Sequence, residues 1–140
     1  LKPGVERTFF EALLRESQTA LRDLNSRGVR ILAGTDALNP MIIPGASIHD
    51  ELALMIDAGL TPYEALKTAT VNPAEVLRRF SNAGAIAPGR DADLLLLQGN
   101  PLEDLGVLRR PEGVVLRGRW FDRVALDARL EAVAAKYGAP

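Results

Sequence analysis

Asp36 is the residue whose type and position best suit chemistry. It lies directly after a short apolar run, residues 29–34, and Thr35. In barrel enzymes, polar residues at the C-terminal ends of strands line the active site. A carboxylate there can bind a divalent metal and accept a proton from water that the metal activates. Asp also commonly stabilises a turn through its own backbone, and on Asp36 alone the turn role is favoured.

His49 is the only histidine of the chain, and there is no cysteine. Disulfides, thiolate zinc sites and cysteine nucleophiles are therefore excluded, and this chain alone cannot build a histidine-rich metal site. We expect His49 to be a hydrogen-bonded structural residue. The alternative is a partner that hydrogen-bonds to a metal ligand or to substrate. A position near a helix N-terminus would lower its pKa and favour neutral imidazole.

Two further polar residues, Thr35 and Asn39, are expected near substrate on position alone. Residues 44–45 of the same loop could also contact substrate. Asp91 and Asp93 are spaced to share one face of a strand, and we expect Asp93 to be a structural acceptor at the start of that strand. The adjacent acids at residues 103–104 fit a solvated turn.

The elements that would position Asp36 begin with a predicted amphipathic helix ending at Gly28. Its apolar face consists of Phe10, Leu13, Ser17, Ala20, Leu21 and Leu24. The apolar run 29–34 predicts a strand buried on both faces, as in a parallel sheet covered by helices. Residues 35–46, rich in Asp, Asn, Pro and Gly, predict a long turn region.

Three helix starts follow, each with a pattern like a capping box. The predicted N-caps are Ser47, Thr61 and Asn72, each with an acidic residue three positions later. Pro directly follows the second and third of them, as suits the first position of a helix. The first helix carries a core-facing stripe of Ile48, Leu52, Met55 and Ile56 and closes at Gly59.

Short strands replace helices after a boundary near residues 81–84. The predicted elements are strands at 92–97 and 113–116, turns at 99–101 and 117–119, and a closing helix at 126–137. Trp120 and Phe121 suit a core or an interface.

Bulk composition is that of a globular chain without a polyanionic or lipid partner. The 140 residues are 47% hydrophobic and 25% charged, with a formal net charge of −1. Such a balance gives no electrostatic footprint for nucleic acid or an anionic membrane, and no apolar run reaches the ~18 residues of a membrane span. The lack of cysteine and of a secretion signal fits a cytoplasmic location.

An ordered series of motifs carries a family resemblance. Gly34-Thr35-Asp36-Ala37 follows the apolar run, and His49-Asp50-Glu51-Leu52 starts the next helix. The series continues through residues 58–66, 69–74, 84–94, 100–104 and 114–118. Together these motifs resemble the amidohydrolase superfamily, most closely the branch of imidazolonepropionase-like enzymes and Xaa-Pro dipeptidases.

The resemblance implies an α/β fold, the C-terminal part of a metal-dependent hydrolase (β/α)8 TIM barrel plus part of a small β-sandwich. Residues 1–82 would supply the last helix–strand unit of the barrel and its following helices, 83–124 a sandwich portion, and 125–140 a C-terminal helix. The His-x-His pair, an acidic or carboxylated lysine ligand and two further histidines would lie upstream of this chain.

For function, the resemblance implies hydrolysis of a carbon–nitrogen bond in a small amide, cyclic amide or dipeptide. Asp36 would be metal ligand and general base, and no other cofactor is expected. The divalent metal would be zinc, as one or two ions with most ligands outside this chain. The complete protein would be a homo-oligomer, and the chain alone inactive. A deaminase of the same superfamily and a non-catalytic module that completes another subunit are the alternatives.

Overall fold

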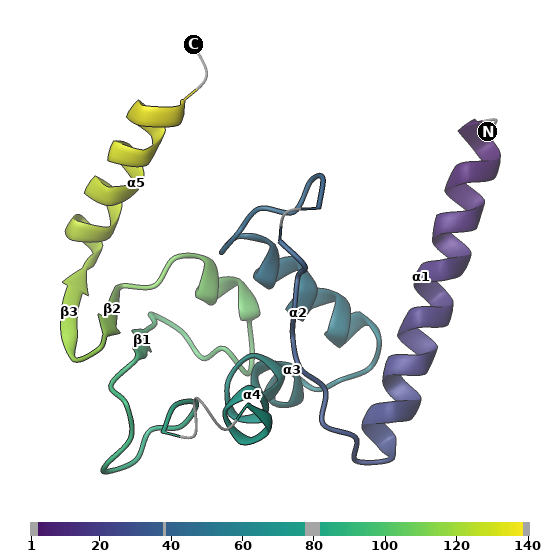
Figure 1. The fold of residues 1–140 in the computed structure, drawn as a ribbon, viewed down its shortest axis with the longest axis horizontal. Helices are drawn as coiled ribbons and strands as arrows, with labels where there is room; N and C mark the ends of the chain where they lie inside the picture. Colours follow the sequence, from purple (N-terminus) through teal and green to yellow (C-terminus); the bar gives the residue numbers. More distant parts are fainter. Residues whose placement is uncertain (1–2, 38, 78–81, 139–140) are drawn as a thin grey trace.

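The computed structural model describes residues 3–37, 39–77 and 82–138, with helices in the first half and a small sheet in the second (Figure 1). The helices are α1 (Pro3–Ser26), α2 (Ser47–Asp57), α3 (Pro62–Ala69), α4 (Val71–Val76), the 3₁₀ helix η2 (Leu105–Arg109) and α5 (Arg123–Tyr137). The strands are β1 (Leu94–Leu96), β2 (Gly113–Leu116) and β3 (Arg119–Asp122). None of the described helices is both long enough and apolar enough to cross a lipid bilayer.

The core lies between α2 and α3. Leu52, Met55, Leu60 and Ala65 form its buried centre. Ile48 and Ile56 pack against that centre, so the predicted apolar stripe of α2 is confirmed. Other partly buried side chains complete the cluster from α1, from the segment after it and from η2: Leu21, Ile31, Ala33, Leu105 and Leu108. The segment that leads to Asp36 is therefore anchored on one side by this core.

The predicted strand at residues 29–34 is wrong for this chain. These residues form an extended connection that runs past α2, without regular structure (Figure 1). Helices supply its hydrogen bonds: Ala33 N donates to Thr68 O over 2.9 Å, and the Asn72 side-chain amide donates to Ile31 O over 2.8 Å. A strand needs a neighbouring strand to complete its ladder, and the described residues provide none beside this segment.

Of the three predicted capping boxes, the one at Thr61 is confirmed. Its hydroxyl accepts from Glu64 N, and the Glu64 carboxylate accepts from Thr61 N over 2.8 Å. The other two predictions are wrong. Ser47 is already helical and its hydroxyl accepts from Ile43 N, while Asn72 lies inside α4 with its amide committed to Ile31. The Ser47 hydroxyl is used by the loop just before its helix, and the Asn72 amide by a distant segment, so neither side chain caps a helix.

The sheet is antiparallel in the order β1-β2-β3. Arg117 and Gly118 form the two-residue turn between β2 and β3, with φ of 51° and 76°. Two positive φ values characterise a type I′ turn, whose twist matches that of the strands, so the predicted tight turn is confirmed. The strand predicted at residues 92–97 is shorter, Leu94–Leu96. Asp93 is the predicted structural acceptor, receiving Arg117 N over 2.6 Å.

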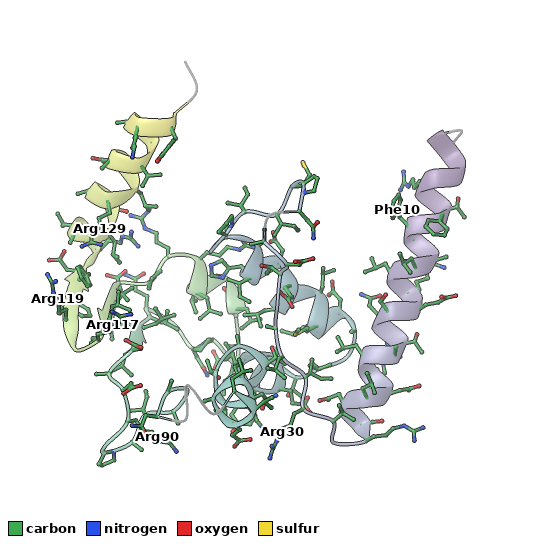
Figure 2. All side chains as sticks on the ribbon, in the orientation of Figure 1. Phe10, Arg30, Arg90, Arg117, Arg119 and Arg129 are labelled. Carbon is green, nitrogen blue, oxygen red and sulfur yellow. The ribbon has the colours of Figure 1, made fainter. Side chains whose placement is uncertain are left out.

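The aromatic pair of β3 covers the sheet without being buried. Trp120 is 52% exposed, and its ring lies over Gly113, where an added Cβ would be 1.9 Å from the ring. The guanidinium groups of Arg119 and Arg129, which Figure 2 labels, lie 5.5 and 4.5 Å from the ring centre of Phe121. The two aromatic residues are therefore not core residues, and the alternative that they lie at an interface stays a prediction.

The two long outer helices leave apolar side chains uncovered. Helix α1 ends as predicted, with Gly28 at a φ of 75° beyond its last turn. Of its predicted apolar face, Leu21 reaches the core, whereas Phe10 is 63% exposed. Leu130 of α5 is exposed to the same extent, 63%. Helices α1 and α5 stand away from the centre on opposite sides (Figure 1).

Candidate functional site

Asp36 sits in a tight turn at the end of the extended connection. Its φ of 50° is in the left-handed region, uncommon for a residue with a side chain. Asn39 closes the turn, its side-chain amide donating to Asp36 Oδ2 over 2.6 Å. The Asp36 side chain is exposed, and its other oxygen, Oδ1, makes no hydrogen bond or ion pair with the described residues. The turn role and an available carboxylate oxygen thus coexist in one residue.

Thr35 borders an open cavity of about 340 Å³ next to this turn. The cavity is lined by the end of the extended connection, by the loop before α2 and by one face of α2: Gly34, Thr35, Met41, Ile42, Ser47, Asp50, Glu51 and Leu54. Met41 has a φ of 71° and is 94% exposed, so the loop contains a second non-glycine residue in the left-handed region. Such conformations concentrate at functional sites.

Glu51 connects α2 to this cavity. Its Oε1 accepts from Gly34 N over 2.7 Å, and its Oε2 is buried with no hydrogen-bond partner among the described residues. In the sequence Glu51 appears within the His49-Asp50-Glu51-Leu52 motif, and no role was predicted for it. Helical spacing predicts only that Glu51 and His49, two positions apart, face opposite sides of α2.

His49 lies on the other side of α2, against η2. It borders a small cavity of about 70 Å³ that shares no lining residue with the one beside Thr35. Its Nδ1 is buried and has no hydrogen-bond partner in the described part of the chain. Burial lowers the pKa of the imidazole, the nearby Arg109 lowers it further, and Asp50 opposes both. The pKa shift has the predicted direction, but its main cause is burial, and no hydrogen bond at Nδ1 supports the expected structural role among those residues.

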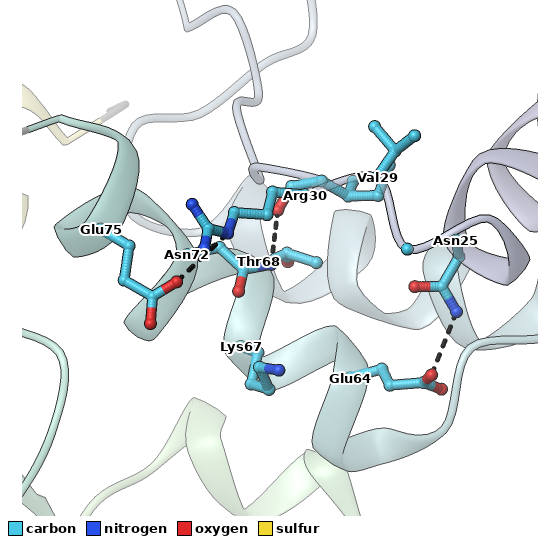
Figure 3. Close-up of a pocket in the computed structure, with 10 residues that line it drawn as sticks. Asn25, Val29, Arg30, Glu64, Lys67, Thr68, Asn72 and Glu75 are labelled. Atoms are coloured by element: carbon cyan, nitrogen blue, oxygen red, sulfur yellow. Dashed lines mark hydrogen bonds and ion pairs between the residues drawn. The ribbon is translucent and has the colours of Figure 1, made fainter.

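The cavity in Figure 3 lies at the start of the extended connection, at the end away from Asp36. It has about 360 Å³, and its polar groups pair with one another: Arg30 Nε lies 3.3 Å from Glu75 Oε2, and the Asn25 amide donates to Glu64 over 3.1 Å. The polar side chains of this cavity that make these contacts are thus satisfied within the chain itself.

Asp36 is the candidate metal ligand of this chain. Asp36 offers an exposed oxygen at the end of a segment of strand-like composition, which fits one ligand of a divalent cation. No three His, Asp or Glu side chains lie close enough together, within the described ranges, to hold an ion. The structure brings Asp36, Asn39 and Thr35 together and keeps His49 apart. The described residues could therefore supply one ligand of a metal site but not a complete site.

The family model that matches this chain is that of the amidohydrolase family, over residues 6–121. The match includes the Asp36 turn, the Glu51 contact and all three strands up to Phe121.

Curated relatives cover several activities. An ochratoxinase from Aspergillus niger is 34% identical over 112 residues, which are 74% of this chain and 23% of the relative. An adenine deaminase from Ligilactobacillus salivarius is 36% identical over 94 residues, 67% of this chain and 16% of the relative. An imidazolonepropionase from Deinococcus deserti is 44% identical over 85 residues, 60% of this chain and 21% of the relative.

Solved structures agree. A Xaa-Pro dipeptidase with methionine bound in its active site has 30% identity and a TM-score of 0.65, and an amidohydrolase has 30% identity and a TM-score of 0.62. Each match covers 75% of this chain and 25% of the solved chain. The chain therefore spans about a quarter or less of these proteins.

Proposed function

The chain belongs to the amidohydrolase family, and from this premise we propose that the protein containing it hydrolyses a carbon–nitrogen bond with the help of a divalent metal. The observation that carries the proposal is the place of Asp36. It follows an apolar segment, projects an exposed carboxylate and lies within the matched residues 6–121. Strand ends of this kind supply the polar groups of barrel active sites.

Asp36 would act as a metal ligand and as a proton acceptor. The Asn39 amide holds Oδ2 at 2.6 Å and so orients the carboxylate, leaving Oδ1 for a ligand. A divalent ion held there, zinc by expectation, would lower the pKa of water and so supply the nucleophile. The carboxylate of Asp36 would accept the proton that this water loses and return it to the leaving nitrogen. The remaining ligands of one or two ions would come from residues outside this chain.

Thr35 and Asn39 would border the substrate, and His49 would act at most indirectly. Thr35 lines the cavity next to Asp36, whereas His49 faces a separate cavity against η2. The small amide or dipeptide substrate rests on the likeness to the Xaa-Pro dipeptidase structure and to ochratoxinase. Deamination is the second candidate because an adenine deaminase is among the relatives.

The likeness to solved amidohydrolases also supports a proposal for the whole protein. Residues 1–82 would complete a (β/α)8 barrel, 83–124 would contribute to a β-sandwich, and 125–140 would form a terminal helix. The unpaired connection at residues 29–34 would become the last barrel strand when neighbouring strands flank it. The complete protein would assemble as a homo-oligomer.

The test is Asp36→Asn in the complete protein. Asn is nearly isosteric, so the fold should be intact by circular dichroism, while loss of a positioned general base lowers kcat about 10² to 10⁴-fold. Assays with a Xaa-Pro dipeptide, an N-acyl amino acid and adenine separate amide hydrolysis from deamination, which releases ammonia. The matched control is Asp57→Asn, an exposed acid at the end of α2. Near-normal turnover of Asp36→Asn with metal bound would leave Asp36 as a turn residue only.

A further inference from the structure

We propose that Glu51 is a positioning residue for Asp36. Its carboxylate holds the backbone at Gly34, two residues before Asp36, and thereby fixes the direction in which the Asp36 side chain points. This inference rests on the proposed function and adds a residue to the machinery of the same site.

The first support is where the contact lies on the extended connection. Before it, the connection is held by Thr68, through Ala33. After it, Thr35 makes no hydrogen bond with the described residues, and Asp36 bonds only to Asn39 within its own turn. The bond from Gly34 N to Glu51 is thus the last described hydrogen bond between a helix and this segment before Asp36.

The second support is the kind of bond. A carboxylate that accepts from a backbone N–H makes a charge-assisted hydrogen bond, roughly twice as strong as a neutral one. The distance of 2.7 Å from Gly34 N to Glu51 Oε1 is as short as expected for a charge-assisted bond, about 2.7 to 2.9 Å. Glu51 is carried by α2, whose Leu52 and Met55 are buried in the core, so its backbone is fixed by packing. Because α2 is packed into the core, the bond from Glu51 fixes the position of Gly34 relative to that core.

The third support is that Glu51 is costly as a purely structural residue. Its Oε2 is buried without a partner among the described residues, and such an unsatisfied oxygen costs free energy. Residues that break a local rule of this kind are expected at functional sites. Here the neighbouring Asp36 has a left-handed φ of 50°, a conformation that persists only where the surroundings enforce it.

The experiment uses the complete protein with Glu51→Ala, Glu51→Asp and Glu51→Gln. Ala removes the acceptor, Asp withdraws it by one methylene, and Gln keeps an acceptor at the same reach. The control is Asp57→Ala, which removes an exposed acid at the end of the same helix that does not line the cavity beside Asp36. The readouts are amide hydrogen exchange of residues 33–37 without substrate, zinc affinity by competition with a chromophoric chelator, and kcat and KM.

We expect Ala and Asp to lose protection at the Gly34 amide and to bind zinc about 10 to 100-fold more weakly, the usual loss when a group that orients metal ligands is removed. Their kcat should fall with KM little changed. Gln keeps a neutral acceptor at the same reach and should retain part of the protection, affinity and kcat, whereas the Asp57 control keeps all three. Unchanged exchange and zinc affinity in the Ala and Asp variants would overturn the proposal. Equal losses in Asp57→Ala would do so too, since they would indicate general loosening of α2. Hydrogen exchange needs no activity, so this outcome is separate from a failure of the Asp36→Asn test.

Discussion

The imidazole of His49 is held against η2 with its Nδ1 buried, and this burial makes its charge unfavourable in the folded protein. Burial and Arg109 lower the pKa of His49 below its ordinary value of 6.5. In the unfolded chain the imidazole therefore takes up a proton at a higher pH than in the folded one. The stability that neutral His49 contributes is complete above about pH 6.5 and is lost as pH falls through the lowered pKa of the folded state.

Replacing His49 should remove this part of the pH dependence. We expect the Tm of the wild-type protein to fall more steeply than that of His49→Asn between about pH 7.5 and about pH 5, the range in which imidazoles titrate. Differential scanning fluorimetry of both proteins over this range gives the comparison, and subtraction cancels the groups that they share. A constant Tm difference across the range would show that His49 titrates alike in both states. Turnover at neutral pH should fall far less than in Asp36→Asn.

Single residues were predicted from the sequence where chain neighbours determine their role. Asp36 lies in the turn region predicted after residue 34, where it bonds to Asn39 three positions on, while its role as a metal ligand stays a prediction. The position of Asp93 as an acceptor at a strand start is confirmed by its bond to Arg117. Glu51 was missed because its partner, Gly34, is 17 positions away and a backbone N–H leaves no mark in the sequence.

At the scale of elements, the capping box of α3 offers a clean measurement. Thr61→Ala removes the acceptor for Glu64 N and leaves an orphan amide at the helix start. We expect a loss of about 0.5 to 2 kcal/mol in the free energy of unfolding, as for other N-cap residues. Urea denaturation of the complete protein measures it.

The matched control for that substitution is Thr19→Ala, inside α1. The Thr19 hydroxyl bonds only to Arg15 O of its own helix, and Ala is the better helix former. Thr19→Ala should therefore leave stability unchanged or raise it slightly. If both variants lost the same stability, the capping box would have no special contribution.

Elements were predicted well where short-range signals agree with one another. Strand β2 follows from the apolar run at residues 113–116, and its hairpin with β3 from the Arg117-Gly118 turn, both local. The three cap patterns looked alike, yet Ser47 bonds to Ile43 in the preceding loop and Asn72 to the distant Ile31, in place of their own helix starts. A side chain with several possible partners can bond to any of them, and a cap pattern alone does not decide which.

At the scale of the whole molecule, the unpaired residues 29–34 and the exposed helices α1 and α5 share one cause: the described residues provide no partner to cover them. Residues 29–34 have a buried strand's composition but lack strand neighbours in the described chain, and Phe10 and Leu130 project from outer helices that stand away from the centre. The helices and the strands β1 and β2 occur in the predicted order, whereas the strand predicted at residues 29–34 does not form and η2 was not predicted. The composition of residues 29–34 could not predict that they would remain unpaired, because a strand also needs a neighbouring strand, and the described residues provide none there.

This arrangement predicts how the 140-residue chain behaves when it is produced by itself. Exposed apolar patches of this kind associate in water, and an unpaired edge recruits other chains. We expect the isolated chain to self-associate or to unfold without a cooperative transition. Size-exclusion chromatography with light scattering, together with thermal unfolding by circular dichroism, checks both points.

Phe10→Lys should reduce the association, because it removes a 63% exposed ring that packs edge-on against Phe9, 5.6 Å away between ring centres. Thr19→Lys adds the same charge to the same helix at an exposed polar position and should leave association nearly unchanged. Equal effects of the two lysines would mean that charge, and not apolar contact, controls association. A monodisperse monomer of the unmodified chain with one cooperative unfolding transition would contradict the prediction altogether, since it would mean that the small core around Leu52 and Met55 stabilises this chain without the strands and helices of a larger protein.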